Sequence, residues 1–444
     1  MKKILLITVI GFCLTANIYG QTLTLSQCLD SARAHNRTLR NAALAIEGAD
    51  LQVSEARTKY YPQISANVMA FHAFDKMVKG SGTIPLEIAA ISPALAGYAG
   101  QPYAVSELSS AYSVTLTAMQ PIYTGGQIRT ANRLAGVQRD VEELKLHLQE
   151  RELEQKITEN YWHIAAIKYN LSTLDAADRQ VAEVHRQVEQ FLHAGMCTDN
   201  DLLRVNLRQQ ELASQRLRLD NAKHVLLLLL AQQIGLADKE IDIDTEIEQS
   251  KESSPAMGTG GELREEISLA TKAIEAAQLQ VKMERAKLMP TVAIGLMAYN
   301  TGLGGLSSRA RSIVDDNMIN AMVAATVSVP ISDWWGGSKA IKRRQLAVRQ
   351  AQNNLRDIQE QIYIDIESAR ADLNQAAKQI DIALASVEQA TENLRITNLQ
   401  YSSGTAQLTD LLDAETLNRQ AQNSLNNARA DYQRCLAIYR LKNK

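Results

Sequence analysis

The chain has 444 residues and a formal net charge of −2, from 47 basic and 49 acidic side chains. This balance argues against nucleic acid as the main partner, because a surface that binds phosphates needs an excess of basic residues. Aromatic residues make up only 5% of the chain, whereas large compact cores usually contain more of them. Long helices that pack through Ala, Leu and Ile need fewer, so the composition favours long helices.

The first 20 residues have the pattern of a secretory signal peptide. Lys2 and Lys3 give a charged start, residues 4–14 form a short apolar stretch, and residues 16–20 offer a cleavage region before Gln21. The apolar stretch is too short to span a bilayer as a helix. We therefore expect an exported protein that begins at Gln21, the alternative being an uncleaved buried helix.

Cys13 is removed with the signal peptide, and the cysteines that remain are Cys28, Cys197 and Cys435. Their wide spacing provides neither a disulfide framework nor a metal site, and we expect no lipid anchor, no metal and no cofactor. Beyond the signal peptide, no stretch of about 20 apolar residues follows. The exported protein is therefore expected to be either soluble in the periplasm or held in the outer membrane by β-strands.

Two repeats follow along the chain, which indicates an internal duplication. The first repeat, 21–235, contains an N-terminal helix that ends at Tyr60-Tyr61-Pro62, a strand pair over 63–120, Gly125-Gly126 and a long helical hairpin. A linker rich in Asp, Glu, Ser and Gly occupies 236–261. The second repeat, 262–444, contains a helix that ends at Leu288-Met289-Pro290, a strand pair over 291–329, Gly336-Gly337 and another long hairpin.

The long helical segments have heptad character, with apolar or small residues at steps of three and four that average about 3.5. The segment from Gln127 to Leu192 is predicted to form one helix, roughly 100 Å long at 1.5 Å per residue. Gly195 and Gly404 stand where each hairpin should turn, because glycine accepts the positive φ of a helix end. A helix of this length suits a conduit across the periplasm better than a compact domain.

Four short segments alternate between apolar and polar residues, and each has about the length of a tilted membrane strand. Four strands cannot close a membrane barrel, but three chains would supply about twelve. We therefore expect an α+β fold, a duplicated unit of long antiparallel coiled-coil helices that form an α-barrel, plus four strands per chain in a shared trimeric β-barrel. The alternative is a pair of soluble hairpins. The loops 75–107 and 307–317 would face the cell exterior.

Four motifs stand out in order along the chain, namely residues 23–29, Tyr61-Pro62, residues 121–126 and Met289-Pro290. The first resembles the start of the mature members of the TolC-like outer membrane efflux protein family. Tyr61-Pro62 and Met289-Pro290 resemble the helix-to-strand junctions of that family, and residues 121–126 resemble its strand-to-helix elbow. The resemblance implies a homotrimer in the outer membrane with a periplasmic helical extension. It also implies a passive exit duct of a tripartite efflux or type I secretion system, which works with a periplasmic adaptor (membrane fusion) protein and an inner-membrane pump of RND or ABC type.

The resemblance also assigns roles to residues at the hairpin turns. Asp410 and Asp413 match the carboxylates of a periplasmic selectivity ring, and their spacing of three places both on one helix face. Such rings favour cations over anions. Asp201 and Tyr401 match gate contacts, whereas Ala406 stands where better-studied members have an arginine. The alternative for all four is an ordinary surface position.

Aromatic residues stand at both strand-to-helix elbows, namely Tyr123, Trp334 and Trp335. They are expected either at the membrane–water boundary or in the core of the elbows. Because the segment 330–337 is two residues longer than its partner, the two elbows should differ in shape.

Enzyme chemistry is not expected, because the sequence has no phosphate-binding Gly-Lys-Ser/Thr loop and no zinc protease motif. His185, Glu189 and His193 share a helix face, which we interpret as a solvated coiled-coil face. The main alternative to a channel is a periplasmic coiled-coil structural or adaptor protein with soluble β-hairpins.

Overall fold

The computed structural model describes residues 21–72, 74, 79–83, 102–106, 110–244, 264–304 and 317–443. The expected signal peptide, most of both exterior loops and most of the linker lie outside the described residues. Within the described ranges, no helix combines the length and apolarity needed to cross a membrane. The chain divides into two compact units. The described parts of Met1–Ile46, Val141–Thr271 and Asn353–Lys444 form the helical unit, and Glu47–Asp140 with Lys272–Gln352 form the strand unit.

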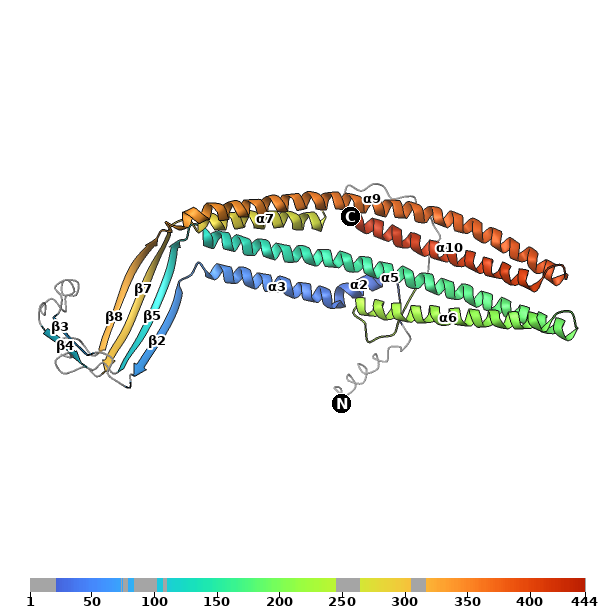
Figure 1. Cartoon of the computed structure of the whole chain (residues 1–444), viewed down its shortest axis with the longest axis horizontal. Coiled ribbons are helices and arrows are strands. Elements are labelled where there is room, and N and C mark those ends of the chain that lie inside the picture. Colours follow the sequence, from blue (N-terminus) through green and yellow to red (C-terminus); the bar gives the residue numbers. More distant parts are fainter. Residues whose placement is uncertain are drawn as a thin grey trace, which may run out of the picture. The chain divides into compact units, whose positions relative to one another are not determined.

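A four-stranded antiparallel sheet dominates the strand unit (Figure 1). Its spatial order is β2 (Gln63–His72), β5 (Ser110–Tyr123), β7 (Thr291–Gly304) and β8 (Asn317–Ser328), so the two repeats pair through β5 and β7. These are the four predicted strands. A separate short pair joins β3 (Lys79–Thr83) and β4 (Pro102–Ser106).

The strand register brings the alternating apolar residues of all four strands to one face of the sheet. Two rows of paired residues cross it, Ile64–Ala118–Leu296–Val323 and Ala66–Leu116–Ala298–Ala321. Because side chains alternate along a strand, the intervening residues fall on the opposite face. That face is more polar, as the row Asn67–Thr115–Tyr299–Asn320 illustrates.

The strand β5 continues three residues past the expected end of the strand pair at residue 120. Pro121 lies inside it, and the pairing with β7 shifts between Pro121 and Tyr123. A bulge accommodates a residue without a backbone N–H, which explains why proline does not end this strand.

The two elbows between strand and helix differ in shape, as predicted. Gly125 and Gly126 have φ values of 62° and 85° and lie in a turn before α5. In the second elbow, α9 already begins at Asp333, so Gly336 and Gly337 belong to its first turns. The two glycine pairs therefore match in sequence but not in conformation. Gly337 instead lets Leu288 approach the α9 backbone, where an added Cβ would collide with that side chain.

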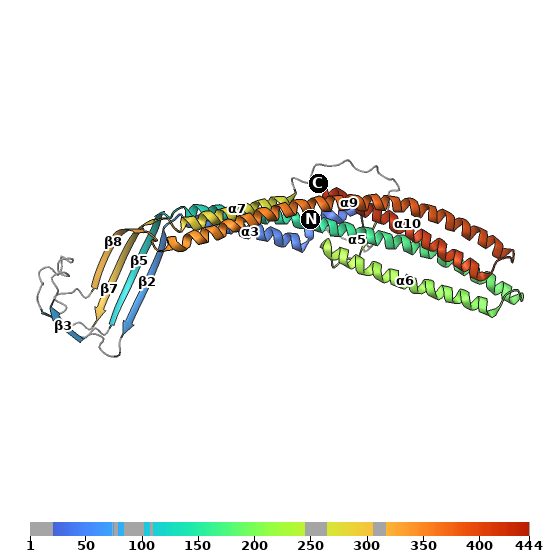
Figure 2. The same ribbon diagram turned by 45° about the horizontal axis from the view of Figure 1, so that its top comes forward.

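The helices of the two predicted hairpins are α5 (Gln127–His193) with α6 (Asp199–Gln233), and α9 (Asp333–Ser402) with α10 (Leu408–Lys442). Both hairpins are seen in Figures 1 and 2. With 67 and 70 residues, α5 and α9 are each roughly 100 Å long at 1.5 Å per residue. The predicted hairpins are thus confirmed. The helix α7 (Glu265–Ala286) precedes β7.

The predicted N-terminal helix is two helices, α2 (Leu25–His35) and α3 (Arg37–Thr58). Asn36 separates them, because its side-chain oxygen accepts hydrogen bonds from the backbone N–H groups of Thr38, at 2.7 Å, and Leu39, at 3.2 Å. Its amide nitrogen donates to the Gln233 carbonyl at 2.7 Å. The same side chain thus caps α3 and ties the break to the end of α6.

A short parallel sheet, which the sequence analysis missed, packs against this region. It pairs β1 (Gln21–Leu23) with β6 (Ile241–Ile243), so the first part of the expected linker is ordered structure. Lys168 Nζ of α5 donates to Asp242 Oδ2 at 2.9 Å, and the Tyr161 hydroxyl donates to the Asp244 carbonyl. Both residues of α5 hold the chain that leaves the first hairpin.

Candidate functional site

The two hairpin turns of the helical unit have the same backbone hydrogen bonds. At the end of α5, the N–H groups of Gly195 and Met196 donate to the carbonyls of Leu192 and Phe191, at 3.0 and 2.8 Å. At the end of α9, Gly404 and Thr405 donate to Tyr401 and Gln400 at the same distances. This is the Schellman pattern, which requires a left-handed residue after the helix. Gly195 and Gly404 supply it, with φ values of 71° and 74°.

We expect the substitution Gly404→Ala to destabilise the protein by about 1 kcal/mol, because an L-residue is strained at positive φ. Nothing lies within 4 Å of an added Cβ at this position, so the cost is conformational only. The measurement is the thermal unfolding midpoint. Gly136→Ala is the matched control, since this glycine also has open space around it but lies inside α5, where alanine is favoured. A midpoint that rose for both variants would contradict the prediction.

Equivalent carboxylates begin the returning helices. Asp201 Oδ2 accepts hydrogen bonds from the Thr198 backbone N–H at 3.0 Å and hydroxyl at 2.8 Å, and Asp410 Oδ2 accepts one from the Gln407 N–H at 3.1 Å. Each aspartate therefore satisfies a backbone donor at the start of its helix. This structural task is compatible with a further role, because a carboxylate has acceptor sites left over.

Tyr401 is a core residue of the turn region. Its side chain is only 9% exposed, and its ring centroid lies 6.2 Å from that of Phe191 of α5. It belongs to a cluster with buried residues from α5, α6 and α10, including Val188, Val205 and Leu411. Tyr401 of the second hairpin thus packs against residues of the first and stabilises the contact between the two.

Asp201 and Tyr401 line one cavity of about 600 Å³ between the two turns, which also includes Cys197, Arg204 and Ala406. Burial raises the pKa of Tyr401, and the proximity of Cys197 and Asp201 raises it further. Within the part of the chain that the structure describes, no hydrogen bond joins the Tyr401 hydroxyl to Asp201. The two predicted gate residues are therefore neighbours in one chain, and their role as a latch stays a prediction.

The predicted ring residues Asp410 and Asp413 are both exposed on α10. Positions 201 and 410 are equivalent in the two turns, and so are positions 204 and 413, three residues further on. The first hairpin has Arg204 at this second position, where the other has Asp413. Only the second hairpin therefore has a carboxylate at both of these positions, and the role of Asp410 and Asp413 as a ring stays a prediction.

A buried ionic cluster, which was not expected from the sequence, lies next to the apolar cluster around Tyr401. Glu415 and Arg419 of α10 are 6% and 9% exposed, and Arg208 of α6 donates to the Thr416 hydroxyl at 2.6 Å. Both carboxylate oxygens of Glu415 are buried without a hydrogen-bond partner. Burial raises the pKa of Glu415 to about 7, although nearby Arg208 opposes this shift.

A signal for this cluster exists in the sequence. Positions 411, 415 and 419 follow one another at steps of four, so they share a helix face. Because Leu411 is a core residue, with no exposed surface, charged residues at the next two steps indicate burial of charge.

The elbow aromatics are exposed in the single chain. Tyr123, Trp334 and Trp335 are 49%, 51% and 83% exposed. The indole N–H of Trp334 donates to the Leu288 carbonyl at 3.1 Å, which ties the start of α9 to the end of α7. Trp334 thus combines an elbow contact with an exposed ring. The predicted position of all three aromatic residues at a membrane–water boundary stays a prediction.

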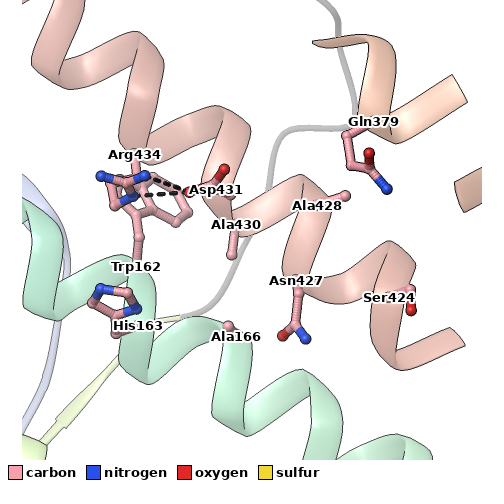
Figure 3. A pocket seen from close by; sticks show the side chains of 10 residues that line it. All are labelled: Trp162, His163, Ala166, Gln379, Ser424, Asn427, Ala428, Ala430, Asp431 and Arg434. Carbon is pink, nitrogen blue, oxygen red and sulfur yellow. Dashed lines mark hydrogen bonds and ion pairs between the residues drawn. The ribbon is translucent and has the colours of Figure 1, made fainter. Parts of the chain in front are cut away.

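A second cavity of the helical unit, of about 480 Å³, lies between α5 and α10 (Figure 3). Small side chains line much of it, among them Ala166, Ala428 and Ala430. Its charged pair, Asp431 and Arg434, is mutually bonded at 2.6 Å. Because the pair neutralises itself, the cavity offers no charge that would select a ligand.

Within the described residues, no group of three or more His, Cys, Asp or Glu side chains could hold a metal ion. His185 has other contacts, since its Nε2 lies 2.9 Å from Asn206 Oδ1 and its Nδ1 lies 3.6 Å from Glu189. His193 is exposed at the end of α5.

A family model described as outer membrane efflux protein matches residues 28–232 and 262–440. Comparison with curated proteins finds no match. Among solved structures, the fold resembles that of the outer membrane channel CmeC of Campylobacter jejuni, at 15% sequence identity and a TM-score of 0.77, over 94% of this chain and 85% of that chain.

Two further outer membrane proteins have the same fold. The outer membrane protein VceC of Vibrio cholerae has 16% identity and a TM-score of 0.72, over 94% of this chain and 96% of that chain. The outer membrane channel MtrE of Neisseria gonorrhoeae, in its open state, has 17% identity and a TM-score of 0.70, over 94% of this chain and 88% of that chain.

Proposed function

The chain belongs to the outer membrane efflux protein family, and from this premise we propose that three copies form a duct whose periplasmic end is gated by the two hairpin turns. The protein is an outer-membrane channel with a periplasmic helical extension, and it serves as the exit duct of an efflux system. Its family is one of channels rather than enzymes. The homotrimer, the residues of the gate and the individual partners are the proposal.

One observation supports the trimer above all, namely that the four-stranded sheet is incomplete. Within the described strands, β2 and β8 each have a single neighbour, and the apolar face of the sheet is exposed. On the edge strands, Val68 and Val323 are 73% and 72% exposed. Lipid does not tolerate unpaired backbone groups, and known membrane barrels have at least eight strands. Three copies, with about twelve strands, satisfy both conditions.

The helical unit supports assembly in the same way. Large apolar side chains of α6 are exposed in the single chain, including Leu203, Leu207 and Leu217. Exposed apolar residues repeated along a helix usually mark an interface. We propose that neighbouring chains cover them, so that the four long helices of each copy form a shared helical barrel.

In the proposed gate, Asp410 and Asp413 of three chains form two rings of carboxylates at the narrow end of the duct. The exposure of both side chains supports this, as does their spacing on one face of α10. Tyr401 and Asp201 hold the two turns together in the closed state. A periplasmic adaptor and an inner-membrane pump of RND or ABC type act on this end and supply the energy, since the duct itself has no motif for ATP hydrolysis.

The test of the rings is the double variant Asp410→Asn with Asp413→Asn in planar lipid bilayers. We expect weaker cation selectivity and weaker block by divalent cations, because a carboxylate ring attracts cations. The matched control is Asp220→Asn with Asp357→Asn, which removes the same charge from exposed positions of α6 and α9. Unchanged selectivity and block in the first variant would refute the ring.

A further inference from the structure

Exposed basic side chains gather where the helices of the strand unit meet the strands. Near the end of α3 they are Arg57 and Lys59, and near the start of α5 they are Arg129 and Arg133. The last two are four residues apart, so they share a helix face.

The other two helices repeat this pattern. Lys282 and Arg285 are exposed in the last turns of α7, and Lys339, Lys342 and Arg343 in the first turns of α9. These nine residues are named the basic collar. Each lies within roughly 15 Å of the strand end of its helix, at 1.5 Å per residue.

Hydrogen bonds hold the four helix ends side by side (Figure 2). Asn132 of α5 donates to the Ala56 carbonyl of α3 at 2.9 Å, and Gln127 of α5 donates to the Ala286 carbonyl of α7 at 3.4 Å. The bond from Trp334 to Leu288 joins α9 to α7. The four helix ends that carry the basic side chains therefore lie next to one another at the base of the sheet.

The collar is not neutralised by the chain itself. Among the described residues, none of its nine side chains has an ion-pair partner. In the segments 55–62, 124–133, 282–290 and 330–343 the acidic residues are Glu55, Glu284 and Asp333, and Glu284 already pairs with Lys287 and Arg344. Since the whole chain has a net charge of −2, this positive zone is a local feature and not a consequence of composition.

Exposed aromatic residues border the collar on the side of the strands. Tyr61, Tyr123 and Trp335 are 66%, 49% and 83% exposed. Tyr and Trp prefer the level of the lipid headgroups. If the strands span the outer membrane, as the proposed function holds, the collar lies at the headgroups of the periplasmic leaflet.

We propose that the basic collar binds the anionic headgroups of phospholipids in the periplasmic leaflet of the outer membrane. Arginine and lysine pair with phosphate through charge-assisted hydrogen bonds, and clustered basic residues next to a membrane segment attract anionic lipid. A trimer would present three copies of the collar around the duct. The inference rests on the proposed function, because it needs the strands to be in the membrane.

The test uses the fluorescence of the elbow tryptophans. The chain has three tryptophans. When Trp162 is replaced by phenylalanine, all tryptophan fluorescence therefore comes from Trp334 and Trp335. The protein is reconstituted in vesicles of phosphatidylcholine that contain brominated phosphatidylglycerol or brominated phosphatidylcholine as quencher. We expect at least about threefold stronger association of phosphatidylglycerol, falling with added salt.

The collar variant carries Arg129→Gln, Arg133→Gln, Lys342→Gln and Arg343→Gln. For this variant we expect the ratio of phosphatidylglycerol to phosphatidylcholine association to fall towards one. In the control variant, Arg179→Gln, Arg218→Gln, Arg356→Gln and Lys378→Gln remove the same charge from exposed positions of the long helices outside the collar. The control should keep the preference of the parent.

Conductance of the same samples in planar bilayers separates the possible failures. A conducting parent without preference for phosphatidylglycerol would overturn the lipid inference and leave the channel standing. A collar variant that changed ion selectivity but kept the lipid preference would also overturn it, because the collar would then line the duct. A parent that never entered vesicles would overturn both proposals.

Discussion

The substitution Glu415→Gln is expected to stabilise the protein above neutral pH by about 3 kcal/mol per chain. Glu415 is 6% exposed, and neither of its carboxylate oxygens has a partner. An ionised carboxylate without hydrogen bonds is costly to bury. Glutamine has nearly the same shape and no charge, so it removes this cost.

The sign of the pH dependence follows from the raised pKa of Glu415, which burial moves from 4.5 to about 7. The folded protein then binds the proton more tightly than the unfolded chain does. The contribution of Glu415 to stability is therefore most favourable below about pH 4.5, falls as the pH rises to about 7 and stays constant above it. The charged group that acts on this carboxyl is Arg208 of α6. The attraction of Arg208 is already included in the raised value.

The measurement is the unfolding midpoint of parent and variant across pH 4 to 9. The two curves should coincide at the acidic end, where the parent carboxyl is neutral, and separate steadily up to neutral pH. Glu388→Gln is the control, because this carboxyl is exposed on α9. A variant that was less stable than the parent at pH 8 would show that the ionised carboxylate is favourably paired in the assembled protein.

Replacing Tyr401 by alanine should destabilise the turn region by about 3–5 kcal/mol, the range for removing a large buried aromatic side chain. The ring fills the space between Phe191, Leu408 and the first residues of α6. Its loss leaves a cavity at the contact between the hairpins, so the gate should open more often. Both effects are measurable, as a lower unfolding midpoint and a higher open probability in planar bilayers.

Tyr401→Phe separates the hydroxyl from the ring, since it keeps the packing and removes only one polar atom. If Tyr401 latches the gate through Asp201, this variant should also raise open probability or antibiotic permeability, with a cost of about 1 kcal/mol. A silent Tyr401→Phe next to a leaky Tyr401→Ala would assign Tyr401 to the core alone and remove it from the latch.

The long helices and the four strands could be predicted because their patterns are long. Heptad spacing repeats many times in α5 and α9, and alternation marks each strand. Short elements depend on distant partners instead. The three residues of β6 are a strand because they pair with β1, and the sequence contains no local sign of that pairing. The break at Asn36 depends on its contact with Gln233.

In the candidate site, too, features with a local sequence pattern could be predicted, whereas features that depend on distant contacts could not. The turns could be placed at Gly195 and Gly404, because glycine has a direct conformational role there. Asp201 and Tyr401 were expected together from the resemblance alone, and they line one cavity. The burial of Glu415 was missed because an acidic residue in a coiled coil is normally assigned to the surface. The elbows were expected to differ because their segments differ in length, and their two glycine pairs, although identical in sequence, adopt different conformations.

The charge difference between Arg204 and Asp413 has a consequence for how a closed ring of hairpins could be arranged. A trimer has six hairpin ends, and the duplication makes their backbones alike. At positions 204 and 413, however, a trimer has three cationic and three anionic side chains. Opposite charges attract when they adjoin and like charges repel, so these two positions favour an alternating order of the hairpins. The opposite charges at positions 204 and 413 thus favour an arrangement in which each hairpin of the first repeat adjoins hairpins of the second repeat.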